Sequence, residues 1–280
     1  MSHNMPELAE VETVLRGLAP KLINRKISEV TLYRSDLRKP FPKDFAAKLQ
    51  DGIITHLSRR SKYIIATLDN AYSWIIHLGM TGRLTWHDTA AATPEFPKHT
   101  HFSCSFVDGG WLSYTDPRRF GLMNIYETNN LAYAIELVNL GPEPLEAEFN
   151  IEYLHHQCTR SKRNIKQLLM DSNIVVGVGN IYASESLFRA GILPTRLANS
   201  LNNVECKALV KAITETLLAA IEAGGSSIRD FQNSGGEIGY FQKQLRVYGR
   251  TDLPCIQCES NIKRIVQNGR STYFCAICQR

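Results

Sequence analysis

Four cysteines are the feature that most constrains how this chain can fold. They form two Cys-x-x-Cys pairs, Cys255 with Cys258 and Cys275 with Cys278, with 16 residues between the pairs. This spacing is typical of a structural zinc site in which the intervening residues form a hairpin. Four thiolates leave no open position on the metal. We therefore predict one Zn²⁺ that supports the fold and takes no part in catalysis, in preference to two disulfides or four unrelated thiols.

The start of the chain and its apolar runs bear on localisation. Residues Met1–Glu7 lack the basic-then-apolar order of a secretory signal. No apolar run reaches the roughly 18 residues that a membrane span needs. We expect a protein that does not cross a membrane and that lies in the cytosol, where thiols stay reduced. The remaining cysteines, Cys104, Cys158 and Cys206, are then expected to stand alone as small core residues.

Basic residues are concentrated in the C-terminal half of the sequence. Residues 1–150 carry 16 Lys and Arg against 17 Asp and Glu, whereas residues 151–280 carry 16 against 10. From Lys243 to Arg280 there are seven basic and two acidic residues. Such a concentration favours a polyanionic partner, although a surface chosen for solubility has the same signature.

The first half of the sequence predicts one helix followed by a β-rich domain. Leu8, Val11, Leu15 and Leu18 have helical spacing, with Pro6 at the entry and Pro20 near the exit. Beyond them come short β-rich runs separated by turn residues, at 27–32, 63–68, 74–78, 102–107, 111–114 and 122–126. We expect a mostly antiparallel sandwich or barrel carrying one helix.

The second half predicts helices and a small terminal module. Two prolines and a glycine punctuate residues 139–145, which favours a linker there. Helical spacing follows at 151–158, 164–170, 181–190 and 204–223. The expected domains are therefore residues 1–138, a linker at 139–145, a helical domain at 146–242 and a zinc module at 243–280. A glycine-bearing loop is expected at 231–240.

Five motifs occur in an order that resembles formamidopyrimidine-DNA glycosylases. They are the cysteine module and the runs Met5-Pro-Glu-Leu-Ala-Glu-Val-Glu-Thr13, Thr115-Asp-Pro-Arg-Arg-Phe-Gly121, Gly177-Val-Gly-Asn-Ile-Tyr-Ala183 and Val247-Tyr-Gly-Arg250. The resemblance implies an α+β fold with an N-terminal helix and β-sandwich, a helix–two-turn–helix domain and a C-terminal zinc finger. It also implies base-excision repair in the bacterial cytoplasm, associated with the nucleoid. The expected activity of this monomer on double-stranded DNA is excision of oxidised purines, 8-oxoguanine and formamidopyrimidines, followed by strand cleavage at the abasic site.

The resemblance assigns catalysis to Pro6, Glu7, Lys62 and Arg270. An α-amine titrates near 8, so a terminal proline would be substantially unprotonated at neutral pH and could attack the sugar C1′. Glu7 would act as the acid and base beside the sugar. Lys62 and Arg270 would grip the backbone at the lesion. Read without the resemblance, Pro6 and Glu7 are ordinary residues of a helix start.

Eight further residues are implied to contact DNA. An extruded base leaves a hole and a partnerless cytosine, which an apolar wedge, a hydrogen-bond donor and an aromatic ring would fill. Glycines before a helix would let backbone amides approach a phosphate. The residues so assigned are Met80, Arg118 and Phe120 for the hole, Asn180 and Lys166 for phosphates, and His99, Arg119 and Tyr240 for further contacts.

The residues ahead of Pro6 bear directly on this mechanism. An internal proline has a tertiary amide nitrogen and cannot form a Schiff base. Met5 followed by a small residue has the form of an initiator methionine that is removed, so we expect the active protein to begin at Pro6. Two alternatives remain: an endonuclease VIII-like glycosylase for oxidised pyrimidines, or a zinc-finger protein that binds damaged DNA without cutting it if the amine is blocked.

Overall fold

The computed structural model describes residues 5–88, 94–225 and 241–280, which form two compact units. The first unit contains residues 10–138. The second contains residues 7–9, 139–223 and 241–280. The two units are described separately below. None of the helices in these ranges combines the length and the apolar character that a membrane span requires.

The predicted N-terminal helix is present as α1 (Leu8–Leu22). Val11, Val14 and Leu18 are buried in the core of the first unit, which accounts for their helical spacing. Pro20 lies inside the helix, which continues to Leu22. A proline this close to the end forfeits one backbone hydrogen bond and leaves the rest of the helix intact.

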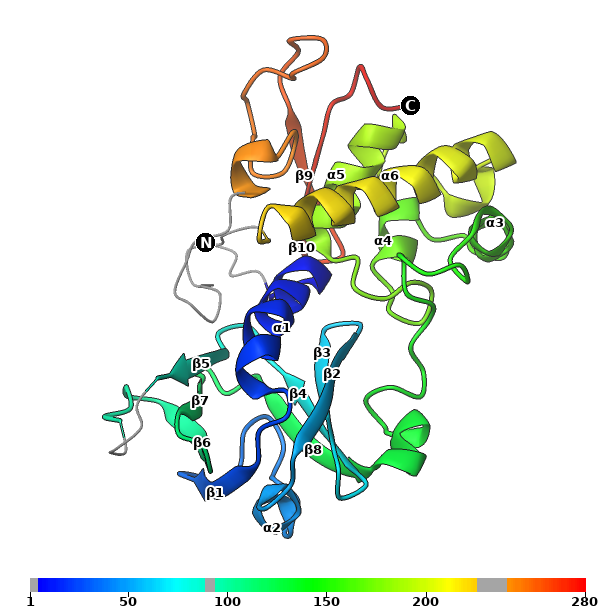
Figure 1. Ribbon diagram of the computed structural model, residues 1–280. Helices are drawn as coiled ribbons and strands as arrows, with labels where there is room; N and C mark the ends of the chain where they lie inside the picture. Colours follow the sequence, from blue (N-terminus) through cyan, green and yellow to red (C-terminus); the bar gives the residue numbers. More distant parts are fainter. Residues whose placement is uncertain (1–4, 89–93, 226–240) are drawn as a thin grey trace. The chain divides into compact units, whose positions relative to one another are not determined.

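The β-rich region is a sandwich of two antiparallel sheets (Figure 1). The first sheet has the order β1-β6-β7-β5 and the second the order β2-β3-β4-β8. One core contains buried residues of both sheets and of α1, and the rings of Trp74 (β4) and Phe102 (β6) lie 5.0 Å apart across it. The barrel alternative is therefore wrong. The strands are β1 (Ile27–Leu32), β2 (Ile54–Arg60), β3 (Tyr63–Leu68), β4 (Tyr72–His77), β5 (Arg83–His87), β6 (Thr100–Phe106), β7 (Trp111–Thr115) and β8 (Leu122–Glu127).

Two strands and one α-helix of this unit were not predicted: β2, β5 and the short helix α2 (Phe45–Leu49). The strand β2 is rich in polar side chains, and its pairing with β3 holds it in the sheet. The helix α2 has only five residues, too few for a periodic signal, yet Phe45 and Leu49 are fully buried. The prediction of a single helix in this domain is therefore wrong.

The second unit contains the four predicted helices, α3 (Ile151–Thr159), α4 (Ile165–Leu169), α5 (Asn180–Ala190) and α6 (Asn203–Glu222). Asparagine side chains cap α3, α4 and α6 at Asn150, Asn164 and Asn202, which satisfies backbone amides that a helix start leaves free. Short 3₁₀ turns lie at Thr128–Tyr133 (η1) in the first unit and at Ala198–Ser200 (η2) and Phe241–Gln244 (η3) in the second.

Cys158 and Cys206 do not stand alone as expected. They lie on α3 and α6, both fully buried, and the interaction of the two thiols raises the pKa of Cys158 and lowers that of Cys206. The two helices pack together, and no local sequence pattern indicates that α3 and α6 contact each other.

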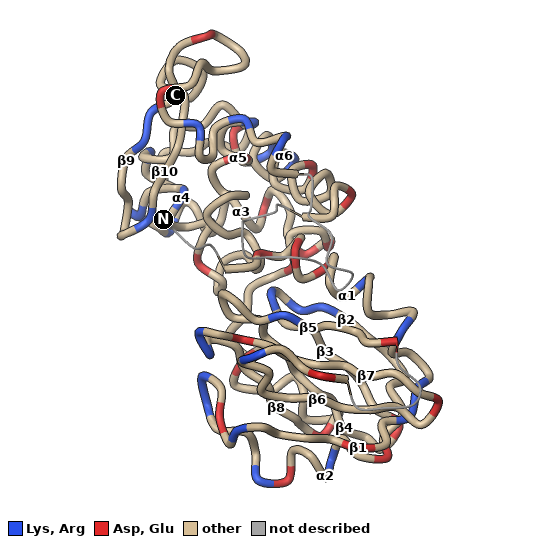
Figure 2. Tube along the Cα trace, turned by 90° about the vertical axis from the view of Figure 1, so that its left-hand side faces the viewer, with Lys and Arg blue, Asp and Glu red and all other residues tan. Residues whose placement is uncertain are grey.

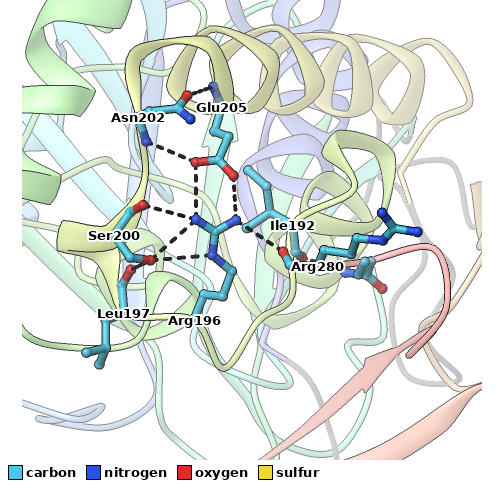
Figure 3. Close-up of polar contacts among 8 residues, drawn as sticks. Ile192, Arg196, Leu197, Ser200, Asn202, Glu205 and Arg280 are labelled. Carbon is cyan, nitrogen blue, oxygen red and sulfur yellow. Dashed lines mark hydrogen bonds and ion pairs between the residues drawn. The ribbon is translucent and has the colours of Figure 1, made fainter.

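The last part of the second unit is a two-stranded hairpin between the cysteine pairs. It consists of β9 (Lys263–Gln267) and β10 (Arg270–Phe274), joined by Asn268 and Gly269 with φ of 49° and 73°, the left-handed backbone that an Asn-Gly hairpin turn requires. Arg196 fastens the final residue, since its guanidinium donates to the carbonyl of Arg280 at 3.2 Å and to Glu205 on α6 (Figure 3).

Candidate functional site

Glu7 is fixed at the start of α5, although it is 174 residues away in sequence. Its carboxylate accepts hydrogen bonds from the backbone amides of Ile181 at 3.2 Å and Tyr182 at 3.3 Å. The side chain is only 3% exposed. A carboxylate at a helix N-terminus is stabilised by the free amides and by the helix dipole. This seat immobilises the carboxylate directly beside Pro6 in the sequence.

The two glycines before α5 accommodate Glu7 and its neighbour Leu8. A side chain at Gly179 would collide with the Glu7 carboxylate, and one at Gly177 would collide with Leu8. Gly177 also has a φ of 75°, which favours glycine. The expectation that these glycines let amides approach a phosphate is therefore wrong for Ile181 and Tyr182, since their amides already bond Glu7.

Lys166 and Asn180 form a buried network with the finger hairpin. The ammonium of Lys166 donates to Asn180 Oδ1 at 2.7 Å, to Thr272 Oγ1 at 2.7 Å and to the carbonyl of Ser271 at 3.1 Å. Asn180 is the first residue of α5, and its Nδ2 donates to the hydroxyl of Tyr248 at 3.4 Å. Burial lowers the pKa of Lys166 to about 7; the Glu7 charge opposes this shift and Arg270 adds to it.

Arg270 opens β10 directly before the two hairpin residues that bind Lys166. Its side chain is exposed, and together with Lys166 and Arg163 it lines a pocket of about 260 Å³. Figure 2 shows lysines and arginines along the hairpin and around α4. This part of the second unit therefore presents positive charge, as a phosphate backbone would require.

The four predicted zinc ligands lie together. The sulfurs of Cys255, Cys258, Cys275 and Cys278 all lie within 4.8 Å of one another, and a tetrahedral site with Zn–S of about 2.3 Å places its sulfurs about 3.8 Å apart. The backbone amides of Gln257 and Cys278 donate to the sulfurs of Cys255 and Cys275, and such bonds favour thiolates. The residues present therefore fit one zinc ion.

Lys62 lies in the turn between β2 and β3, next to Ser61, which is buried with a φ of 56°. The guanidinium of Arg59 holds this turn through the carbonyl of Ser61 at 3.0 Å and is itself paired with Glu12 at 2.9 Å. The charge of Lys62 reaches His77 at the end of β4.

His77 is a residue that the sequence analysis did not single out. Burial lowers its pKa to about 4, and the charges of Lys62 and Arg38 add to this shift. Its Nδ1 accepts a hydrogen bond from the amide of Gly79 at 3.0 Å, which requires a neutral ring. The only sequence signal was its place three residues before Met80.

Two loops of the first unit bring Met80, Arg118 and Phe120 to one place. Gly79 has a φ of 67° and lies against the backbone of Phe120, where a Cβ would collide. The guanidinium of Arg118 lies 4.7 Å from the centre of the Phe120 ring. Phe120 is 43% exposed and Met80 is partly exposed. Read from the sequence alone both would be core residues, whereas the structure leaves both at least partly exposed.

Buried Asp116 holds these loops together. Its carboxylate accepts from the hydroxyls of Thr81 and Tyr114, the latter at 3.1 Å, and from the amide of Gly121 at 2.8 Å. Thr81 in turn accepts from the amide of Arg118 at 3.2 Å. The sequence analysis quoted Asp116 inside a motif and gave it no role.

The remaining predicted DNA contacts are His99, Arg119 and Tyr240. His99 and Arg119 are exposed, with φ of 70° and 55°. The amide of Arg119 bonds the carbonyl of Asp116 at 3.2 Å, and its side chain lies 3.6 Å from Asp36. Tyr240 and the loop 231–240 lie outside the described residues.

Three family models match successive parts of the chain. Residues 5–123 match the N-terminal domain of formamidopyrimidine-DNA glycosylase, residues 140–232 match the H2TH domain of the same enzyme, and residues 252–280 match the zinc finger found in FPG and IleRS.

Curated relatives and solved structures agree along almost the whole length. Formamidopyrimidine-DNA glycosylases of Cereibacter sphaeroides (strain KD131) and Thiobacillus denitrificans are 46% and 47% identical, over 99% of this chain and all of theirs. The crystal structure of the MutM (Fpg) protein of Thermus thermophilus has a TM-score of 0.87 at 36% identity and covers 98% of both chains. The Lactococcus lactis Fpg in complex with DNA that contains an abasic site has a TM-score of 0.89 at 33% identity and covers 98% of this chain and 99% of its own.

Proposed function

Since this chain belongs to the formamidopyrimidine-DNA glycosylase family, we propose that it excises oxidised purines, chiefly 8-oxoguanine and formamidopyrimidines, from double-stranded DNA and then cleaves the strand at the abasic site. Three solved structures of family members are complexes with DNA that contains Fapy-dG, carbocyclic 8-oxo-G or an abasic site. Those ligands support the same substrate class here.

The observation that carries the proposal is the fixed position of Glu7. The carboxylate follows Pro6 directly and is held by two backbone amides of α5. A nucleophile and an acid/base group can act on one sugar only if both are held close together. Glu7 has no freedom to swing away, since the start of α5 encloses it.

In the proposed reaction the free amine of Pro6 forms a bond to C1′ while the bond from C1′ to the base breaks. Glu7 serves as the proton donor that opens the sugar ring at its oxygen, which leaves an iminium between Pro6 and C1′. The iminium withdraws electrons, so the C2′ proton is lost and the bond from C3′ to its phosphate oxygen breaks. In a second elimination the C4′ proton is lost and the bond from C5′ to its phosphate oxygen breaks, which releases the other phosphate.

Cationic and polar residues position the DNA. We assign the backbone at the lesion to Lys62, Asn180 and Arg270, with His99 and Arg119 as further contacts. Met80, Arg118 and Phe120 fill the space that the extruded base leaves, and Tyr240 is assigned a further DNA contact. Phosphate contacts of this kind fix register and orientation without reading sequence.

The zinc ion has a structural part in this proposal. Cys255, Cys258, Cys275 and Cys278 would hold it, and the closed set of ligands supplies fold stability. The proposed domain boundaries are those predicted from the sequence, residues 1–138, 146–242 and 243–280. The proposed setting is a monomer on DNA in the bacterial cytoplasm.

Covalent trapping tests the proposal. Protein that begins at Pro6 is expected to be trapped by borohydride on duplex DNA containing 8-oxoguanine, because reduction converts the iminium into a stable amine. Protein that retains Met1 should bind the same DNA without trapping, and intact mass establishes each N-terminus beforehand. Trapping of a verified Met1 form would assign the nucleophile to another amine, such as Lys62. A thymine glycol duplex cleaved in preference to 8-oxoguanine would overturn the substrate class.

A further inference from the structure

Lys166 is a buried lysine that no step of the proposed chemistry uses. It is 2% exposed. An ammonium has three protons to donate, and in Lys166 these have three acceptors in Asn180, Ser271 and Thr272. A DNA phosphate would have to displace one of these partners to bind the ammonium.

All three partners of Lys166 are neutral, which makes this burial costly. A buried charge is ordinarily compensated by an opposite charge. The charged groups that influence the ammonium are Glu7, which favours its protonation, and Arg270, which disfavours it. Asn180, one of the neutral partners, in turn donates to the hydroxyl of Tyr248. Stability alone is a poor reason for placing a lysine here.

The position of the partners indicates what the lysine does. Asn180 begins α5, while Ser271 and Thr272 directly follow Arg270 on β10. The three hydrogen bonds therefore join α4, α5 and the finger hairpin at one atom. Since the ammonium donates to Asn180 Oδ1, the amide group is oriented with its Nδ2 donor pointing away from Lys166.

We propose that Lys166 is a positioning residue whose ammonium fastens β10 to the start of α5 and so holds Asn180 and Arg270 as one phosphate-binding pair. The proposal rests on the proposed function, since it takes Asn180 and Arg270 to be phosphate ligands. It replaces the expectation that Lys166 itself binds a phosphate.

Salt dependence of DNA binding separates the two roles. Affinity for an undamaged duplex is measured against salt for wild type, Arg270→Ala, Lys166→Met and the double variant. Each single variant should reduce the slope of log affinity against log salt by about 0.9, the value of one phosphate contact. The double variant should lose no more than either single variant, because Lys166 acts through Arg270. A second loss of about 0.9 in the double variant would make Lys166 a direct phosphate ligand. An unchanged slope in Lys166→Met would also overturn the proposal.

Thr272 offers a matched pair of variants. Thr272→Val removes the hydroxyl that accepts from Lys166 and keeps the shape of the side chain, whereas Thr272→Ser keeps the hydroxyl. We expect Thr272→Val to weaken DNA binding about tenfold, in line with the loss of one buried hydrogen bond to a charged group, and Thr272→Ser to remain within about twofold of wild type. Equal effects of the two variants would contradict the role of the hydroxyl.

Hydrogen exchange of the zinc-loaded protein without DNA tests, independently of the proposed function, whether Lys166 fastens β10 to the start of α5, an attachment called the brace below. Amides of Arg270–Phe274 should exchange about tenfold faster in Lys166→Met and Thr272→Val than in wild type and Thr272→Ser. Unchanged exchange in both altered proteins would overturn the brace, whatever the DNA measurements give. Faster exchange together with an unaltered salt slope in Arg270→Ala would instead keep the brace and remove Arg270 as a phosphate ligand.

Discussion

At the scale of single residues, His77 is expected to make the first unit sensitive to acid. Its pKa is about 4 in the folded protein and about 6.5 in an unfolded chain. Between these values the unfolded chain binds more protons, so the free energy of unfolding falls as the pH falls from about 6.5 to about 4 and then levels off. The largest effect is about 3 kcal/mol, at roughly 1.4 kcal/mol per pKa unit. Urea unfolding followed by tryptophan fluorescence measures it, since all three tryptophans, Trp74, Trp86 and Trp111, lie in this unit.

The variant His77→Gln provides the comparison, because it keeps a group able to accept from Gly79 and cannot titrate. Its unfolding free energy should vary less between pH 6.5 and pH 4 than that of wild type. His99→Gln, at an exposed position, should retain the wild-type pH dependence. If wild type and His77→Gln lost stability in parallel, the acid sensitivity would come from other groups.

At the scale of elements, the loops that carry Met80 and Phe120 are expected to act together on duplex DNA. Phe120→Ala and Met80→Ala should each slow capture of 8-oxoguanine in a duplex by about tenfold, because unstacking a base costs a few kcal/mol that their insertion offsets. A lesion placed opposite a gap should restore most of the rate. Single-turnover excision on the two substrates measures this difference.

Tyr133→Ala serves as the control for these loops, since Tyr133 is an aromatic residue that is 80% exposed elsewhere in the same unit. It should behave as wild type on both substrates. Because Phe120 is itself 43% exposed, its loss should leave the thermal midpoint nearly unchanged. Equal defects on duplex and gapped DNA, with a lowered midpoint, would indicate core damage in place of wedge function.

At the scale of the whole molecule, removal of zinc should separate DNA binding from the fold of the sheets. Elemental analysis is expected to find one zinc per chain, and a chelator should remove it and unfold the hairpin, whose core contains only Phe188, Val247 and Ile262 beside Cys255 and Cys275 among the described buried residues. Affinity for duplex DNA should fall by at least about tenfold, since Arg270 is then no longer presented. Tryptophan fluorescence should stay unchanged because the second unit has no tryptophan.

Cys255→Ser should reproduce the effect of the chelator without any added reagent. Zinc returned to the chelated wild-type protein should restore DNA binding, while it should not do so in the variant. If protein verified as free of zinc bound duplex DNA as tightly as the zinc-loaded protein, zinc would not be needed for the DNA-binding surface.

Features that depend on neighbouring residues could be predicted from the sequence alone. The cysteine spacing predicted the four-sulfur cluster, which the structure confirms. The helical spacing between residues 151 and 223 predicted α3 to α6 to within a residue or two, because a repeat of 3.6 residues is visible in the sequence. Where periodicity was absent, in α2 and in the polar strand β2, the prediction failed.

Which distant residues meet could be seen only once the chain was folded. Glu7 bonds α5 across 174 residues and Lys166 bonds Thr272 across 106, and a resemblance could list these residues without saying that one holds another. The sequence analysis assigned the glycines before α5 to phosphate binding, whereas the structure places Glu7 and Leu8 against them. The physical reason is that such contacts depend on how packed elements pair across the chain. Local sequence sets the conformation of an element, whereas burial and the satisfaction of polar groups select its partners.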